Sequence, residues 1–161
     1  MSIAVRRAVP ADDAALDRLD RASFAGGGSV APVAVTPQPF LSATTRPEDV
    51  LVAEVDGVPA GYVKIRPPTS LASNAHVQQI QGLAVDPTLG RRGVGRALLE
   101  AAVAEARRRG ARKLSLRVLA TNTAAQRLYA ACGFETEGVL REEFLLDGRY
   151  VDDWLMARLL D

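Results

Sequence analysis

The sequence predicts one α/β domain over residues 1–161, with a central mixed, mostly antiparallel sheet of about seven strands and helices on both faces. Two observations predict this fold class. Helical and strand periodicities alternate between residues 77 and 134, and pairs of strand-like segments joined by tight-turn residues stand before and after that region. The chain of 161 residues is 48% hydrophobic and 24% charged, a balance that suits one buried core.

The first elements follow from alternation and turn residues. Residues 3–7 are expected to form a strand, and Asp12 or Asp13 to cap a helix that runs to Phe24. Three glycines at residues 26–28 are expected to end this helix, and the prolines that follow predict an irregular segment. Asp56-Gly57 favours a tight turn, which predicts a hairpin of residues 50–55 and 58–65.

The remaining elements are predicted in the order strand, helix, strand, helix and two strands, over residues 77–85, 94–109, 113–119, 122–132, 134–146 and 149–159. The first of these helices has apolar residues about one turn apart, and Gly110 is expected to end it. Gly133 is expected to end the second. Asp147-Gly148 predicts the turn of a closing hairpin.

Composition excludes several classes of protein. The chain has one cysteine, Cys132, so a framework of intrachain disulfides is excluded and a reducing compartment is expected. No apolar stretch approaches the ~20 residues that span a bilayer, and the N-terminus lacks a signal-peptide pattern. The net charge of +1 argues against a general nucleic-acid binder. We therefore expect a cytoplasmic protein without a membrane or nucleic-acid partner.

The charge is unevenly distributed along the chain. Residues 91–112 contain seven arginines and two glutamates, whereas residues 135–161 contain eight acidic residues and three arginines. This segregation favours an anionic ligand beside the first region and a cationic one beside the second. Solvated helix and strand faces are the alternative explanation.

A glycine–arginine loop, residues 90–96, precedes the long predicted helix. Gly93 and Gly95 lack a Cβ, so a ligand can approach the backbone closely. The first N–H groups of a helix have no intrahelical acceptor and lie at the positive end of its dipole, which makes them a site for phosphate. Full positive charges come from Arg91, Arg92 and Arg96.

Two common phosphate loops do not fit this segment. A dinucleotide fingerprint needs a small residue where this chain has Leu98, and an acidic residue about 20 positions on, where it has Ser115. A nucleoside-triphosphate loop needs Lys followed by Ser or Thr, but Arg96 and Ala97 stand there, and Ala97 cannot ligate magnesium.

The segment resembles the coenzyme A loop of the GNAT N-acetyltransferase superfamily, Arg/Gln-x-x-Gly-x-Gly/Ala, with Gly93 and Gly95 at the glycine positions. Gly90 stands where the family has Arg or Gln. Residues 122–134, NTAAQRLYAACGF, resemble the family's Asn-x-x-Ala-x-x-Leu-Tyr-x-x-x-Gly-Phe. The two blocks follow one another in the family's order, and the resemblance extends from residue 77 to the C-terminus.

The resemblance implies a sheet splayed between the strand before the loop and the next strand, where the pantetheine arm of coenzyme A pairs with the backbone of Leu83, Ala84 and Val85. The residues expected to surround the pyrophosphate are Arg91, Arg92, Gly93, Val94, Gly95, Arg96 and Ala97. Asn122 and Tyr129 are also expected to contact coenzyme A. The Tyr129 hydroxyl is expected to protonate the departing thiolate as a general acid.

Each of these residues also has a structural interpretation. Asn122 stands where a helix cap is favoured, and Tyr129 lies among apolar residues as a core tyrosine does. The glycines of the loop suit an ordinary turn before a helix. This structural role and the family role do not conflict.

The general base is not identified by the resemblance. Some family members have a glutamate on the strand before the loop, where this chain has Gln78, Gln79 and Gln81. Candidates elsewhere are Glu54, His76, Glu142 and Glu143, and we take Glu142 as the candidate base. No metal is expected, because neither a cysteine–histidine cluster nor a spaced set of carboxylates is evident.

The predicted function is transfer of an acetyl group from acetyl-CoA to a primary amine by direct attack in a ternary complex. A small metabolite, an antibiotic and a protein N-terminus are the candidate acceptors. The alternative is a regulatory or interaction module that binds coenzyme A without turnover. The resemblance to the family implies that the protein is a monomer or a homodimer.

Overall fold

The computed structural model describes residues 1–25 and 29–161, so the glycines expected to end the first helix lie outside the described residues. The described strands are β1 (Ile3–Arg7), β2 (Val50–Val55), β3 (Val58–Arg66), β4 (Val77–Val85), β5 (Lys113–Leu119), β6 (Glu135–Leu146) and β7 (Arg149–Leu159). The described α-helices are α1 (Asp13–Phe24), α2 (Val94–Arg108) and α3 (Thr123–Ala131).

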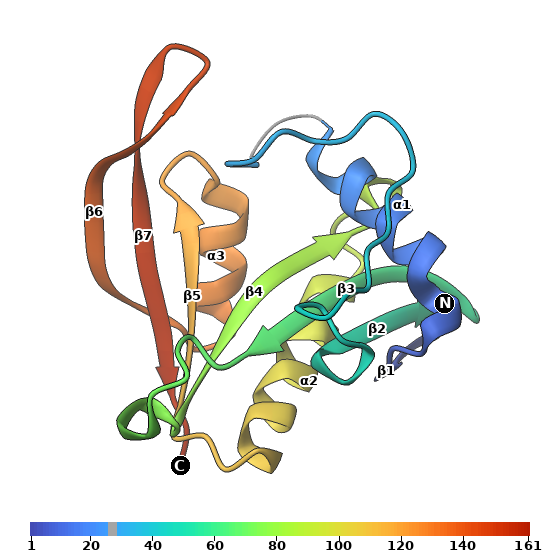
Figure 1. Cartoon of the computed structure of the whole chain (residues 1–161), viewed down its shortest axis with the longest axis horizontal. Coiled ribbons are helices and arrows are strands. Elements are labelled where there is room, and N and C mark those ends of the chain that lie inside the picture. The colour runs from blue at the N-terminus through green and yellow to red at the C-terminus, as the bar shows by residue number, and fades with distance from the viewer. Residues whose placement is uncertain (26–28) are drawn as a thin grey trace. The chain divides into compact units, whose positions relative to one another are not determined.

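Over these residues the strands form a seven-stranded mixed sheet in the order β1-β2-β3-β4-β5-β7-β6, which confirms the predicted fold class (Figure 1). The chain divides into two compact units. The first unit consists of Met1–Ile65 and Gly82–Ala102, and the second of Arg66–Gln81 and Val103–Asp161. Strand β4 and helix α2 each run from one unit into the other.

In the first unit, β1, β2 and β3 pair antiparallel. The β2–β3 turn has positive φ at both central residues, 49° at Asp56 and 83° at Gly57. A type I′ turn requires this combination, and its twist matches that of the strands it joins. The predicted hairpin is therefore confirmed.

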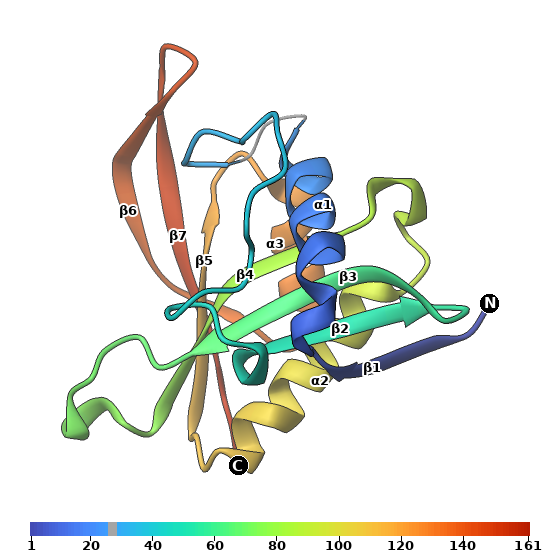
Figure 2. The ribbon, with the colours of Figure 1, turned by 45° about the vertical axis from the view of Figure 1, so that its right-hand side comes forward.

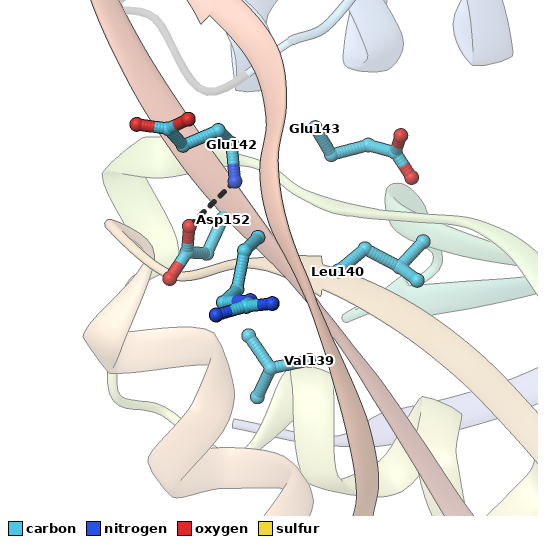
Figure 3. A pocket seen from close by; sticks show the side chains of 6 residues that line it. Val139, Leu140, Glu142, Glu143 and Asp152 are labelled. Carbon is cyan, nitrogen blue, oxygen red and sulfur yellow. Dashed lines mark hydrogen bonds between the residues drawn. The ribbon is translucent and has the colours of Figure 1, made fainter.

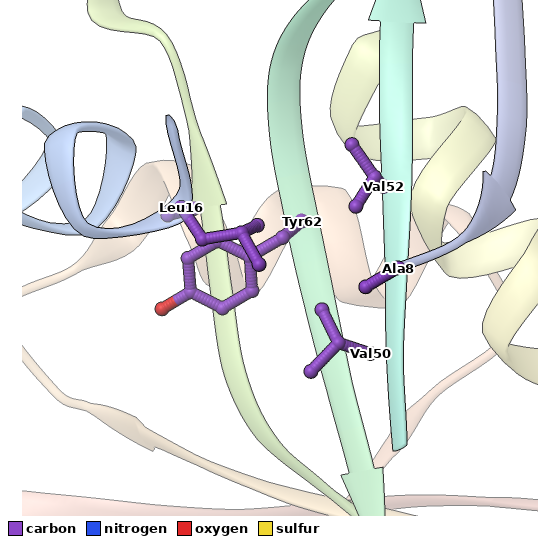
Figure 4. Packing of buried hydrophobic residues seen from close by; sticks show 6 residues of the cluster. Ala8, Leu16, Val50, Val52 and Tyr62 are labelled. Atoms are coloured by element: carbon purple, nitrogen blue, oxygen red, sulfur yellow. The ribbon is translucent and has the colours of Figure 1, made fainter. Parts of the chain in front are cut away.

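The helices of the first unit cover opposite faces of β3, because successive strand side chains point to opposite faces. Helix α1 lies across one face of β3 (Figure 2), where Tyr62 packs in a buried cluster with Leu16 of α1 (Figure 4). At the neighbouring Gly61, a Cβ would lie 3.1 Å from Leu98 Cδ1 and 3.3 Å from Val94 Cγ1, both in α2. Gly61 therefore allows α2 to pack closely against the sheet.

In the second unit, β4 pairs parallel with β5 through Val77–Gln79 and Lys113–Ser115. Strand β5 then pairs antiparallel with β7, and β7 with β6 (Figure 1). Within the described residues, the β4–β5 pairing stops at Gln79, although β4 continues to Val85. This early end of the ladder is the expected splay of the sheet.

Asp12 stands at the N-cap position of α1, as predicted, but its side chain makes no capping hydrogen bond. Asp12 Oδ2 accepts a hydrogen bond from the Val9 N–H at 2.8 Å and pairs with Arg6 at 2.9 Å. Asp13 Oδ1 accepts from the N–H groups of residues 40–41 at 3.0 and 2.7 Å. Both carboxylates are thus held by partners outside the first turn of α1. Local propensity does not reveal such competition.

No helix of the described residues is long and apolar enough to cross a bilayer.

Candidate functional site

The glycine–arginine loop has the backbone geometry of an anion site. Arg91 and Gly93 have φ of 65° and 88°, and α2 begins at the next residue, Val94. Left-handed residues that alternate with ordinary ones turn successive N–H groups toward one side, which forms a concave anion-binding surface. This surface continues into the free N–H groups of a 15-residue helix. The loop therefore fits a phosphate group.

The loop is anchored at both ends while its middle is exposed. Before it, Asp86 Oδ1 accepts hydrogen bonds from the Thr88 N–H at 2.9 Å and the Thr88 hydroxyl at 2.7 Å, which lowers the pKa of Asp86. After it, Val94 and Leu98 are fully buried. Arg91 and Arg92 are exposed and have no side-chain partner among the described residues.

The residues of the first turn of α2 differ from this pattern. Arg96 pairs with Glu100 one turn along α2 at 3.4 Å, which offsets part of its charge. Gly95 and Ala97 lie half-buried in the first turn of α2. Gly95 therefore offers its backbone N–H group to an anion, whereas the Ala97 N–H donates to Gly93 O at 3.0 Å.

The strand before the loop has backbone available on one edge. Ala84 is buried, whereas Leu83 and Val85 are half-buried. Because the β4–β5 ladder ends at Gln79, residues 83–85 are not paired with β5 in the described part of the chain. An extended ligand can add to such an edge by main-chain hydrogen bonds.

Helix α3 begins at Asn122, whose Oδ1 accepts a hydrogen bond from the Ala125 N–H at 3.2 Å. The capping role that its position favours is confirmed. The side-chain oxygen is occupied by the cap, so the exposed amide NH₂ is the part of Asn122 that remains for a ligand.

The C-terminus of α3 explains why tyrosine, glycine and phenylalanine have fixed spacing in the second motif. Gly133 has φ of 89°, its N–H donates to Ala130 O at 3.1 Å, and the Phe134 N–H donates to Tyr129 O at 3.0 Å. These bonds form a Schellman motif, which usually carries an apolar contact between the same two outer positions. Here that contact is between the rings of Tyr129 and Phe134, 6.1 Å apart.

Strand β7 holds this helix end in place. Arg158 Nη1 donates to Cys132 O at 3.0 Å, and the Arg158 side chain passes within 3.4 Å of where a Cβ of Gly133 would lie. A cation at a helix C-terminus is favoured by the helix dipole. The position of Tyr129 is thus determined by the helix, the motif that ends it and β7.

The Tyr129 hydroxyl is a free and weakly acidic donor. Its side chain is 7% exposed, and burial raises the pKa of Tyr129 to about 12. The hydroxyl has no hydrogen-bond partner among the described residues, and none of their fully buried side-chain polar atoms lacks one, so this oxygen touches solvent. Tyr129 is consequently protonated at neutral pH and able to donate a hydrogen bond.

The candidate bases differ in whether their side chains have a hydrogen-bond or ion-pair partner. Glu54 Oε1 accepts from Arg6 Nε at 2.9 Å, and Glu143 pairs with Arg117 at 3.4 Å. Neither the Glu142 carboxylate nor the His76 ring has a partner within the described residues. Glu142 is therefore the glutamate among these candidates that is free to accept a proton.

Glu142 lies where β6 bulges away from β7. The pairing register shifts between Leu140 and Phe144, and Glu142 takes a left-handed φ of 51°. Its N–H donates to Asp152 Oδ1 at 2.8 Å (Figure 3). The side chains of Glu142 and Glu143 diverge to opposite sides of the strand beside a shallow hollow (Figure 3).

The glutamines of β4 are not equivalent. Gln78 is buried, and its Oε1 accepts from Arg109 Nη1 at 3.1 Å, whereas Gln81 Nε2 donates to Gln79 Oε1 at 3.1 Å. Arg109 is also paired with the buried Glu105 at 3.0 Å. Gln78 thus ties β4 to α2.

The sequence did not identify one pair of interacting residues, Tyr62 and Asp20. The Tyr62 hydroxyl donates to Asp20 Oδ1 at 2.5 Å, and burial raises the pKa of Tyr62 above its usual value. A Cβ at Gly82 would lie 3.3 Å from Tyr62 Cε2. A glycine inside a strand can mark such a close approach, and this was the available signal.

Comparison with known proteins identifies similar chains. The profile of the Acetyltransferase (GNAT) family matches residues 15–134. The [ribosomal protein bS18]-alanine N-acetyltransferase of Escherichia coli (strain K12) is 44% identical over 68 residues, 42% of this chain and 46% of that protein. This chain thus spans about half the length of the curated relatives it matches.

Two solved structures match over nearly their whole length. The ribosomal-protein-alanine N-acetyltransferase of Brucella melitensis has a TM-score of 0.80 and 26% identity, with 98% of this chain and 99% of that chain covered. The structure of yncA from Salmonella typhimurium, described with its cofactor acetyl-CoA, has a TM-score of 0.81 and 24% identity, with 100% and 95% covered. The similarity to the yncA structure shows that the two chains share a fold.

Proposed function

Because the chain belongs to the acetyltransferase (GNAT) family, we propose that it transfers the acetyl group of acetyl-CoA to a primary amine. The observation that carries the proposal is the glycine–arginine loop, with left-handed backbone at Arg91 and Gly93 directly before α2. Residues 1–161 would act as one catalytic domain, since β4 and α2 continue from one unit into the other.

The donor is bound mainly by backbone groups. The N–H groups of the glycine–arginine loop and the first turn of α2 hold the pyrophosphate, and Arg91 and Arg92 add charge. The free edge of β4 at Leu83, Ala84 and Val85 pairs with the pantetheine arm. The amide NH₂ of Asn122 adds one hydrogen bond. The other residues that surround the pyrophosphate are Gly93, directly before α2, and Val94, Gly95, Arg96 and Ala97 in its first turn.

The reaction is direct attack of a neutral amine on the acetyl carbonyl carbon. A C–N bond forms, the carbonyl becomes a tetrahedral oxyanion, and its collapse breaks the C–S bond and expels the thiolate. Backbone amides of β4 stabilise the oxyanion. Glu142 accepts the proton that leaves the attacking nitrogen.

Tyr129 acts as the general acid through a hydrogen bond to the departing sulfur. Its pKa of about 12 lies above the ~8.5 of an ordinary thiol, so complete transfer to a free thiolate is uphill by roughly 5 kcal/mol. The hydrogen bond from Tyr129 therefore acts earlier, on the negative charge that develops on sulfur as the C–S bond breaks. Glu142 later releases its proton to solvent, and the expelled thiolate takes a proton from solvent.

An N-terminal α-amine is a suitable acceptor. Its pKa of about 8 leaves far more neutral amine at pH 7 than a lysine side chain with a pKa near 10.4. The names of the relatives from Escherichia coli and Brucella melitensis, both alanine N-acetyltransferases of ribosomal proteins, support the same class. Small-metabolite and antibiotic amines are the other candidates.

Thiol release with acetyl-CoA and a panel of acceptors tests the proposal. The panel contains a peptide that begins with alanine, the same peptide with a blocked N-terminus, small primary amines and alcohols. Release is expected with free amines, together with an acetylated product in the mass spectrum. Acetyl-CoA binding without thiol release from any amine would instead identify a binding module, and activity confined to alcohols would also contradict the proposal.

A further inference from the structure

A cavity of about 330 Å³ opens in the first unit between α1 and the segment of residues 29–40. This size lies within the range of about 300–1,000 Å³ that is usual for small-molecule sites. Its wall combines apolar and aromatic residues with polar and charged ones. The lining residues that matter below are Asp17, Asp20, Arg21, Phe24 and Phe40.

The charges of this cavity do not cancel. Asp17 Oδ2 accepts from Arg21 Nε at 3.0 Å and from the Gln38 N–H at 3.2 Å, so its charge is balanced by the guanidinium. Asp20 has no cationic partner among the described residues. Two carboxylates and one guanidinium leave the cavity with a net charge of −1.

Asp20 is held by a neutral donor that leaves one of its oxygens available. The Tyr62 hydroxyl donates to Oδ1 at 2.5 Å, and no bond of the described residues involves Oδ2. Tyr62 is buried and packs edge-to-face against Phe40, with ring centroids 4.9 Å apart. The acid and one aromatic wall of the cavity are therefore positioned by the same side chain.

The same tyrosine connects the cavity to the strand before the glycine–arginine loop. A Cβ at Gly82 would lie 3.4 Å from the Tyr62 hydroxyl oxygen, which is itself bonded to Asp20. Gly82 directly precedes Leu83. The Tyr62 hydroxyl thus lies between Asp20 and Gly82, the residue before the backbone proposed to bind the donor.

We propose that this cavity binds the amine acceptor and that Asp20 determines its specificity by contacting the cationic amine. The inference rests on the proposed acetyltransferase function. An ammonium group donates to Asp20 Oδ2 on binding and releases one proton to solvent before the neutral amine attacks. The rings of Phe24 and Phe40 surround the apolar part of the acceptor and attract its charge. The preferred class is a primary amine on a small apolar or aromatic group.

The test is a binding measurement that requires no turnover. Benzylamine and benzyl alcohol, which have similar shapes but different charges, are titrated calorimetrically into wild type and Asp20→Asn without acetyl-CoA. Asparagine keeps the volume of the side chain and an acceptor for Tyr62 but removes the charge. Asp161→Asn, an exposed residue after β7, is the control for the change in net charge.

Wild type and Asp161→Asn are expected to bind benzylamine at least about 10-fold more tightly than benzyl alcohol, and Asp20→Asn is expected to lose that preference. Equal binding of the two probes by wild type, binding of neither, or an unchanged preference in Asp20→Asn would overturn the inference. Tyr62→Phe keeps the charge of Asp20 but not its orientation. It should show an intermediate preference, and an effect on benzylamine and benzyl alcohol alike would contradict the role of Asp20.

Kinetics then separate this inference from the proposed function. With an active amine, Asp20→Asn should raise the KM for the amine about 10-fold and leave the KM for acetyl-CoA unchanged. An equal KM for the amine in both proteins would refute the inference while the transferase activity stands. Absence of turnover in wild type would refute the function, and the binding result would still decide whether Asp20 recognises amines.

Discussion

The glycine–arginine loop and the β6–β7 hairpin carry opposite charges but hold them in different ways. In the loop, the exposed Arg91 and Arg92 are without side-chain partners among the described residues. In the hairpin, Asp153 and Glu143 pair with Arg117 at 2.5 and 3.4 Å. Net charge along the chain therefore overstates the negative field of the hairpin, because its main counter-ion comes from β5.

The two regions also differ in which groups form them. The loop depends on backbone dihedral angles and helix N–H groups, and it lies inside the family match over residues 15–134. The hairpin begins at Glu135, after that match ends, and depends on side-chain pairs. We infer that donor binding depends on backbone geometry inside the family match, whereas the hairpin contributes side chains from outside it.

The largest expected effect is on Tyr129. Tyr129→Phe keeps the ring contact with Phe134 but removes the hydroxyl, so kcat should fall about 100-fold or more while the Kd for acetyl-CoA stays nearly constant. Steady-state kinetics and calorimetry measure the two quantities. Tyr150→Phe, on the exposed hairpin, is the matched control, and an equal loss there would remove the assigned role.

The pH dependence of stability should reveal the same hydroxyl. The pKa of Tyr129 is raised from 10.0 to about 12 in the folded chain, so the unfolded chain loses the proton first as the pH rises. Native stability should therefore fall between about pH 10 and pH 12, by up to roughly 2.7 kcal/mol from this residue. Urea unfolding of wild type and Tyr129→Phe across this range measures it, and parallel curves for the two proteins would contradict the burial argument.

Charge removal in the loop should have a moderate effect. The double variant Arg91→Gln, Arg92→Gln is expected to weaken acetyl-CoA binding about 10-fold at low salt and less at high salt. The matched double variant Arg107→Gln, Arg112→Gln removes two exposed charges outside the loop. Similar losses in both proteins would show a general field effect and not a local site.

The smallest effect is expected in the hairpin. Glu142→Gln should lower kcat a few-fold near pH 7 and less at alkaline pH, where the amine is already neutral. Glu143→Gln, whose carboxylate pairs with Arg117, should change the pH profile less. A larger loss from Glu143→Gln would reverse the assignment of the base.

Local signals predicted much of the fold. The predicted bounds of β4, β5 and β7 agree with the structure, because alternation and flanking turn residues are contained in the segment itself. The left-handed positions at Gly57, Gly133 and Gly148 were likewise predictable from the residues next to them. The glycine–arginine loop was recognisable for the same reason, since glycine positions report backbone geometry directly.

Features that depend on distant partners were not predictable. Asp12 stands at the predicted N-cap position but makes no capping bond, because Arg6 and the Val9 N–H compete for its carboxylate. Tyr62 and Asp20 are 42 residues apart, so no spacing rule joins them. Gln78 is buried and accepts a hydrogen bond from Arg109, and both properties depend in the same way on tertiary packing.

Acetyl-CoA titrated calorimetrically into Gly93→Val, with Gly148→Val as control, tests the central claim that loop backbone binds the donor. Both glycines have left-handed φ, 88° and 75°, where a β-branched residue is strained, but Gly148 lies in the hairpin turn. The account predicts a Kd about 10- to 100-fold weaker for Gly93→Val and an unchanged Kd for Gly148→Val. Wild-type affinity in a folded Gly93→Val would contradict it.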